Sequence, residues 1–428
     1  MMDCSCFGFW RRRLYAPLRT IQTPPLTRYH KYHETPQHEG VSFATACCIA
    51  INMVMGSGFL ALPQAFASAG LVLGTAVLAI TALALRTTVM YEVEVMCRAE
   101  AWVKANLVPH VITNLRTARR DSEKEMHIST HAFQVVEMCE LFGGRNLQLA
   151  YSIALFLYMF LTLWGFGAVF GSALATYAPV PFLGATGAYC MYVFLFSFVV
   201  VPLSVLEIKE QAAFQNFLTG LRFLIMVLMV GSVLSSLWTG GEPFGGRTAE
   251  FVGTVPYVRW WGLFQTIPSV VYSLNMASAS PTLVSALEHK NSVGAVIWAT
   301  MISSAAMYGL ISIATAYYFG ASVHGSCNVN WEHYRPGGEG AEGVVAVLGR
   351  MLAYTVVLFP AIDVTSVYPL SVMVLANNMM AAIYHDHVDH AENDHVIITT
   401  FRIACGVPPL LCALLLRDFA AIVSYAGA

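Results

Sequence analysis

The backbone around Gly56-Ser57-Gly58 is the first place in this sequence that could bind a ligand. The triplet lies near the middle of the apolar stretch 41–69. Glycine has no Cβ to hold helical geometry or to keep a ligand off the backbone. An unwound turn would present the amides of Ser57, Gly58 and Phe59 at the positive end of the next helical segment, where they could hold a carboxylate. Close helix packing explains the glycines equally well when they are considered alone.

A second interruption favours the ligand-binding interpretation. It lies in the apolar stretch 261–286, where Pro281 is placed to begin a new half-helix. Its polar side chains belong to Asn275, Ser278 and Ser280. Breaks in the first span of each half of a chain point to an inverted-repeat transporter with a substrate site at the membrane midplane. We expect the second break to meet the amine or the side chain of a substrate.

Polar residues in a third apolar stretch, 342–372, are functional candidates because buried polar groups are costly inside a membrane. They are Asp363, Thr365 and Ser366. Asp363 could carry a coupling proton, or it could pair with an arginine. For the two hydroxyl groups, hydrogen bonds to the preceding helical turn are the alternative to a functional role.

Arg86 lies near the centre of a fourth apolar stretch, 71–97, and it needs a partner there. Asp363, Glu92 and Glu94 are the candidates, and the sequence does not choose among them.

Two further groups have ordinary structural explanations beside their functional ones. Tyr158 could close a pocket over a substrate, although aromatic packing accounts for it as well. The histidine-rich run 385–395 could bind a metal or sense pH, although a hydrated cytosolic loop accounts for it too.

The composition indicates that the chain is a membrane protein, so membrane-spanning helices must position these residues. Of the 428 residues, 57% are apolar and only 11% are charged, with a mean hydropathy of +0.61. Soluble domains usually contain about 25% charged residues, so an ordinary soluble enzyme is excluded. The formal charge of -2 gives no reason to expect nucleic acid as a partner. No phosphate-binding loop, dinucleotide-binding glycine pattern or zinc-protease motif occurs, so we expect no cofactor.

A helix crosses a bilayer with about 20 apolar residues. The spans predicted on this basis are 41–69, 71–97, 148–172, 186–207, 213–238, 261–286, 293–319, 342–372 and 396–416, with a tenth beginning near Phe419. We expect the eighth span to continue as a cytosolic helix toward Tyr384. We also expect the C-terminal helices to be truncated, because the tenth apolar segment is too short to cross.

Basic residues predict the orientation. They are concentrated in the tail 1–40 and in the loop 98–146, and the positive-inside rule places both in the cytosol. We therefore expect a disordered cytosolic tail followed by one transmembrane domain, 41–428. Its partners would be the lipid bilayer and a substrate. The plasma membrane and a vacuolar or lysosomal membrane both remain open, and no oligomeric state is predicted.

The segment from Asn52 to Gly70 joins Asn, Gly-x-Gly, Leu-Pro and Ala-Phe in an order that resembles the first-helix signature of the amino acid/auxin permease family. The segments Tyr308 to Gly320 and Asp363 to Leu370, the latter followed by Asn377-Asn378, support the resemblance. It covers roughly residues 41 to 428.

This resemblance implies an all-α, leucine-transporter-like inverted repeat of five plus five helices, with helices 1 and 6 broken. It also implies amino acid transport driven by protons or sodium. In the resembled fold, helices one and eight together hold a sodium ion, which would make Asn52, Thr365 and Ser366 cation ligands, since hard cations bind oxygen. Two alternatives are a membrane enzyme of the acyltransferase type, using the run 385–395, and an amino acid sensor that does not transport.

Overall fold

The computed structural model of the chain describes residues 40–107, 133–239, 244, 252–336, 343–384 and 395–415. Apart from loops and one isolated bridge between Val41 and Leu287, these residues form helices. Four predicted features lie outside the described residues: the tail up to residue 39, loop residues 108–132, the run 385–394 and the tenth span.

The first span is broken at the glycine triplet. Helix α1 covers Phe43–Val54, a 3-10 turn, η4, covers Ser57–Ala61, and helix α2 covers Leu62–Ala69. The two halves are bent by 54°. Between the two halves, the backbone of Met55 and Gly56 is non-helical. The helix is therefore interrupted where the sequence predicts.

The predicted span 261–286 is also interrupted. Helix α8 covers Leu263–Leu274, the turn η8 covers Ala277–Ala279, and helix α9 covers Ser280–Ala286. The side chain of Asn275 accepts a hydrogen bond of 3.3 Å from the amide of Ala277. This local bond competes with helical pairing and turns the chain. Pro281 then lies in the first turn of α9, as its lack of an amide hydrogen favours.

Among the described residues, seven helices are long and apolar enough to cross a membrane, and the broken pair α1 and α2 makes an eighth if it is counted as one span. The seven are α3 (Leu71–Leu107), α5 (Val135–Tyr177), α6 (Gly184–Val205), α7 (Ile208–Thr239), α10 (Val293–Phe319), α11 (Val344–Tyr384) and α13 (His395–Leu415). The predicted all-α, multi-span fold is therefore confirmed. The eighth predicted span is indeed one continuous helix, α11, despite Pro360 and Pro369.

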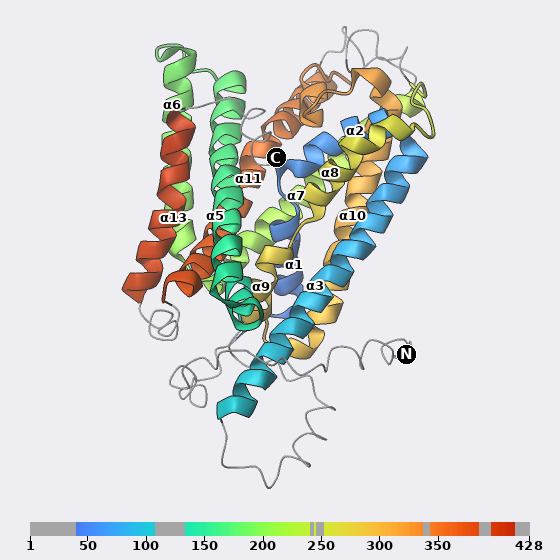
Figure 1. The fold of residues 1–428 in the computed structure, drawn as a ribbon. Coiled ribbons are helices and arrows are strands. Elements are labelled where there is room, and N and C mark those ends of the chain that lie inside the picture. Colours follow the sequence, from blue (N-terminus) through green and yellow to red (C-terminus); the bar gives the residue numbers. More distant parts are fainter. Residues whose placement is uncertain are drawn as a thin grey trace.

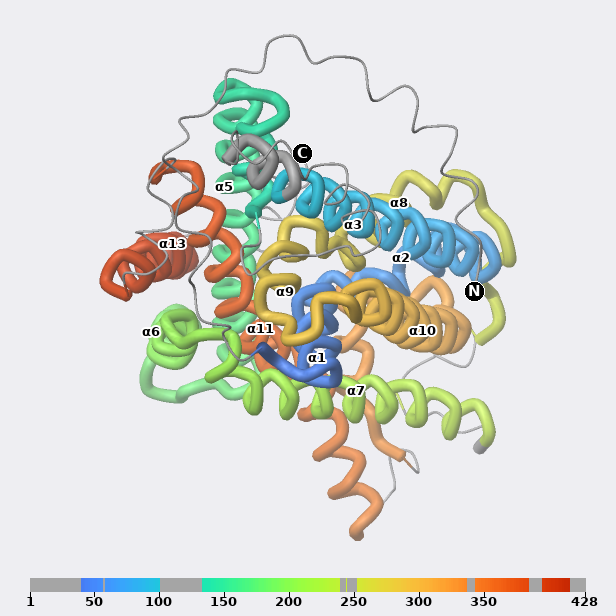
Figure 2. Tube along the Cα trace, turned by 90° about the horizontal axis from the view of Figure 1, so that it is seen from below, coloured from blue at the N-terminus to red at the C-terminus, as the bar shows by residue number. Residues whose placement is uncertain are grey.

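The two broken helices lie side by side and run in opposite directions, with α2 beside α8 and α1 beside α9 (Figure 1). Hydrogen bonds tie them at both ends. The hydroxyl of Thr266 donates to the carbonyl of Ala65 at 3.0 Å, and the amide of Val41 donates to the carbonyl of Ala286 at 2.8 Å. Viewed from the side where α1 begins, α1 and α9 lie between α3, α5, α7 and α10 (Figure 2).

Candidate functional site

The two helix breaks meet at a cavity of about 70 Å³. Its walls come from both breaks, from α5 and from α11. Of the residues predicted to bind substrate, those that line it are Gly56, Gly58, Tyr158, Asn275 and Ser278. Four separate sequence segments, the two breaks, α5 and α11, thus converge on one space.

Gly56 and Gly58 serve different purposes in this arrangement. A Cβ on Gly58 would lie 2.8 Å from Cδ1 of Tyr272 and 2.9 Å from the hydroxyl oxygen of Ser273, which is too close for real atoms. A Cβ on Gly56 would meet only the ring of Phe166, at 3.9 Å. Gly58 is therefore needed for close packing between the breaks, and Gly56 leaves its backbone open to the cavity.

Phe59 and Tyr308 stabilise the breaks by packing. The ring of Phe59 is fully buried, with its centroid 6.0 Å from that of Tyr308 and 5.6 Å from that of Phe359. The hydroxyl of Tyr308 donates to the carbonyl of Ser273 at 3.3 Å, near the end of α8 where the helical bonding stops. The ring of Phe59 thus belongs to the core, and only its backbone could contribute to a ligand site.

Polar atoms in the cavity wall come from uncharged side chains. The Tyr158 side chain is within hydrogen-bonding reach of Asn275. The other hydroxyl-bearing residues of the wall are Thr162, Tyr272, Ser273, Ser278 and Ser371. No charged residue belongs to the wall as the structure describes it. A ligand held here would need to be neutral overall, because an unpaired buried charge is costly.

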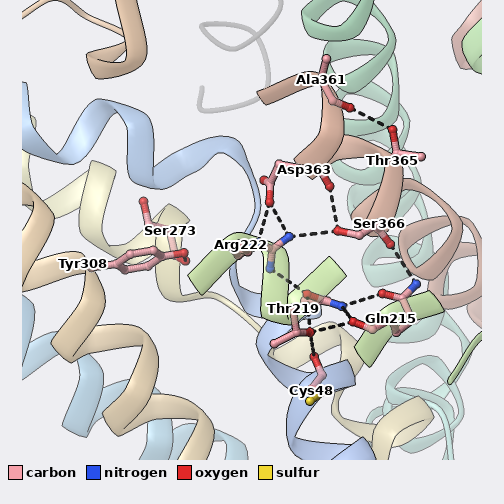
Figure 3. Close-up of polar contacts among 11 residues, drawn as sticks. Cys48, Gln215, Thr219, Arg222, Ser273, Tyr308, Ala361, Asp363, Thr365 and Ser366 are labelled. Carbon is pink, nitrogen blue, oxygen red and sulfur yellow. Dashed lines mark hydrogen bonds and ion pairs between the residues drawn. The ribbon is translucent and has the colours of Figure 1, made fainter. Parts of the chain in front are cut away.

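A second polar region, the arginine cluster, lies between α1, α7 and α11 (Figure 3). We define it by Arg222, Asp363, Asn52, Ser366 and Gln215. Nε of Arg222 donates to Oδ1 of Asp363 at 2.6 Å, one terminal nitrogen donates to Oδ1 of Asn52 at 2.9 Å, and the other donates to the Ser366 hydroxyl at 3.0 Å. Arg222 and Asp363 are 1% and 2% exposed, so this is a buried ion pair.

The amide group of Asn52 completes the arginine cluster on the α1 side. Its nitrogen donates to the side-chain oxygen of Gln215 at 2.6 Å and to the backbone oxygen of the same residue at 3.0 Å. The hydroxyl of Thr219 donates to Oδ1 of Asn52 at 3.0 Å. All the hydrogen-bonding positions of this asparagine face protein groups rather than open space.

The structure brings together three of the four predicted ion-coupling residues. Asn52, Asp363 and Ser366 meet around Arg222, whereas the Thr365 hydroxyl donates to the carbonyl of Ala361 in its own helix at 2.9 Å. Sequence reasoning missed Arg222. Its signal was available, because it is an arginine within the predicted span 213–238, where a charge requires a partner.

None of the three carboxylates considered for Arg86 pairs with it. Asp363 pairs with Arg222, and Glu94 pairs with Arg98 four residues further along α3. The guanidinium of Arg86 instead lies over the ring of Trp298, with its central carbon 4.6 Å from the ring centroid. A cation over an aromatic face is stabilised by the ring quadrupole.

The structure does not test whether the histidine-rich run 385–395 binds a metal. Apart from His395, which begins α13, the run lies outside the described residues. Within the residues described, no group of three or more His, Cys, Asp or Glu side chains could hold a metal ion.

Comparisons with known sequences show distant similarity to proteins named as transmembrane proteins. No protein-family model matches the chain. Transmembrane protein 104 of Pongo abelii and that of Homo sapiens are both 21% identical to it, over 88% of this chain and 82% of theirs.

Two solved transporter structures are also similar. A Na+-coupled sialic acid symporter in a substrate-bound outward-open state covers 94% of this chain and 79% of its own, with 12% identity and a TM-score of 0.50. A manganese transporter from Eremococcus coleocola covers 90% of this chain and 74% of its own, with 13% identity and a TM-score of 0.47. The chain is an integral membrane protein with a multi-span transporter fold.

Proposed function

We propose that this protein is a secondary active transporter of small neutral amino acids. The observation that carries the proposal is the convergence of the two helix breaks on one cavity, with glycine backbone on one side and polar side chains on the other. Broken helices inside a membrane are tolerated where they line a cavity, and such sites bind substrate in inverted-repeat transporters.

The substrate carboxylate would be held by backbone amides at Ser57 and Gly58. These residues begin the turn η4, and amides at the start of a helical turn have no partner within it. Asn275 and Ser278 would meet the ammonium group or a small side chain. Because the described wall of the cavity has no charged residue, a zwitterion with a neutral side chain suits it best.

Proton coupling is the better proposal for the driving ion. The oxygens of Asn52 and Ser366, considered as sodium ligands from the sequence, both accept hydrogen bonds from the guanidinium of Arg222. A fixed cation at this position repels a second cation, and it already satisfies the oxygens that would bind one. We also propose that the chain end before α1 faces the cytosol, following the positive-inside rule.

The test is uptake by the full chain reconstituted in proteoliposomes. Twenty labelled amino acids would be offered under an inward proton gradient, an inward sodium gradient, or neither, with protein-free vesicles as the control. We expect proton-driven accumulation of alanine and similar small neutral amino acids. If no amino acid accumulates under any gradient, the proposal is wrong. Accumulation that requires sodium would overturn the proton assignment alone.

The two alternatives make different predictions in the same assay. A sensor would bind an amino acid, detectable as an increase in thermal stability, without moving it across the vesicle. A membrane enzyme would depend on the run 385–395, and no observation in the described residues favours it.

A further inference from the structure

A carboxylate on α3 contacts the second helix break and has no role in the site described so far. Glu92 is partly buried, and its Oε2 accepts a hydrogen bond of 2.8 Å from the hydroxyl of Ser280. Ser280 is the first residue of α9, and the residue before it, Ala279, lines the cavity. Glu92 is therefore linked to the half-helix that leads away from the cavity, one residue beyond the cavity wall.

Glu92 has no cationic partner within the described part of the chain. The titratable groups that face it are Tyr151 and Cys139, both from α5, which lie within electrostatic range. Arg86, on the same helix, contacts an aromatic ring of α10 instead. Among the described residues, the contact that stabilises the charge of Glu92 is the hydrogen bond from Ser280.

A neighbouring carboxylate on α3, Glu94, has the ion pair that is typical of a glutamate with a structural role. Glu94 forms an ion pair with Arg98, one helical turn further on, and both side chains are substantially exposed. Glu92 has no such partner among the described residues. An ionisable group in a span without a cation is expensive to keep, and such groups in transporters belong to ion pathways and proton relays.

We propose that Glu92 carries the coupling proton, and that its hydrogen bond to Ser280 transmits its protonation state to α9. This inference rests on the proposed transport function. A hydrogen bond to an ionised carboxylate is about twice as strong as one between neutral groups. Binding a proton to Glu92 therefore weakens the link between α3 and α9, and releasing it on the other side of the membrane restores that link.

Asp363 is the competing carrier, and its surroundings count against it. Protonating Asp363 would leave the buried guanidinium of Arg222 without a counter-charge. Leaving one member of a buried pair uncompensated is strongly unfavourable. Protonating Glu92 leaves no such charge behind.

The experiment compares Glu92→Gln with Glu94→Gln in the full chain, reconstituted in proteoliposomes with labelled alanine. Three quantities are measured: exchange of alanine across the membrane without a gradient, accumulation under an inward proton gradient, and alanine-induced proton entry reported by a trapped pH dye. Glutamine has almost the same shape as glutamate and accepts the Ser280 hydrogen bond, but it cannot carry a proton.

We expect Glu92→Gln to exchange alanine measurably, to lose at least tenfold in proton-driven accumulation, and to show no alanine-induced proton entry. Glu94→Gln should match the wild type in all three. If Glu92→Gln accumulates alanine and moves protons as the wild type does, the inference is wrong. Absence of exchange by the wild-type protein would instead count against the proposed function itself.

Ser280→Ala keeps the inference testable if Glu92→Gln does not fold. It removes the donor that stabilises the ionised carboxylate, so the pH dependence of alanine uptake should move to higher pH. A purely structural role for Ser280 would lower the amount of folded protein and leave the pH dependence unchanged. That second result would overturn the inference.

Discussion

The cavity and the arginine cluster share two helices, α1 and α11, yet their polar groups differ. Those of the cavity line an open space, whereas those of the cluster bond mostly to one another. Met53 of α1 lines the cavity, whereas its neighbour Asn52 belongs to the arginine cluster. On α11, Val367 lines the cavity, whereas Ser366 accepts a hydrogen bond from Arg222. Adjacent residues thus face either an open space or a filled network.

This difference between the two regions suggests different roles: the cavity can bind a ligand, and the arginine cluster stabilises the fold. In the arginine cluster, the guanidinium of Arg222 and the amide of Asn52 are matched by protein partners, whereas Oδ2 of Asp363 is buried without a hydrogen-bond partner. In the cavity, glycine backbone and neutral side chains surround unfilled volume. Breaking the arginine cluster should therefore change stability, whereas changing the cavity should change substrate affinity.

The largest effect is expected when the buried ion pair is broken. Arg222→Met leaves Asp363 charged and unpaired, which should lower the free energy of unfolding by about 3–5 kcal/mol. Arg222→Met combined with Asp363→Leu should recover most of that loss, because no charge remains buried. Thermal unfolding in detergent measures both variants. The exposed pair provides a control, since Arg98→Gln should cost less than about 1 kcal/mol. Equal losses for the single and double variants would contradict this account.

Gly58→Ala should have the next largest effect. Its added Cβ would collide with the Tyr272 ring and the Ser273 hydroxyl, and overpacking of this kind costs about 1–3 kcal/mol. Gly56→Ala is the matched control two residues away, where the nearest atom is 3.9 Å from the new Cβ. Thermal unfolding should distinguish the two glycines, and similar stabilities would show that the breaks do not pack as described.

Asn275→Ala should weaken binding, and it also removes the hydrogen bond to the amide of Ala277 at the break. The substitution removes one amide group from the cavity wall, and a single hydrogen bond is worth about 1 kcal/mol, so the KM for alanine uptake should rise about fivefold. Asn330→Ala serves as the control, because that side chain bonds to Ser322 away from the cavity. An unchanged KM in Asn275→Ala would remove this residue from the site.

Thr365→Val should have the smallest effect. The hydroxyl bonds only to the preceding turn of α11, and valine keeps the shape of the side chain. We expect stability within about 0.5 kcal/mol of the wild type, as for substitutions away from special features. Uptake and its response to sodium should not change. A loss of ion dependence in this variant would restore Thr365 as a cation ligand.

The sequence predicted the spans well because hydropathy is a strong signal over 20 or more residues. The predicted span 293–319 has the same bounds as α10, and both helix breaks occur where glycine and Asn275 interrupt apolar segments. These are local properties, and local properties can be predicted from residue type and spacing.

The partners of individual side chains could not be predicted in the same way. Arg222 and Asp363 are 141 residues apart, and their pairing depends on the rotation of two helices about their axes. The same holds for Glu92 and Ser280, which are separated by 188 residues. The sequence made Glu92 one of three candidate partners for Arg86. It shows the charge of each side chain but not the direction in which that side chain projects from its helix.

The ties at both ends of the broken helices limit how this molecule can open. Since α2 is bonded to α8 and the segment before α1 is bonded to the end of α9, a half-helix that moved alone would break these hydrogen bonds. Motion of the halves as two pairs, α2 with α8 and α1 with α9, would keep these bonds, because the interruptions at residues 55–56 and 275–279 separate the pairs.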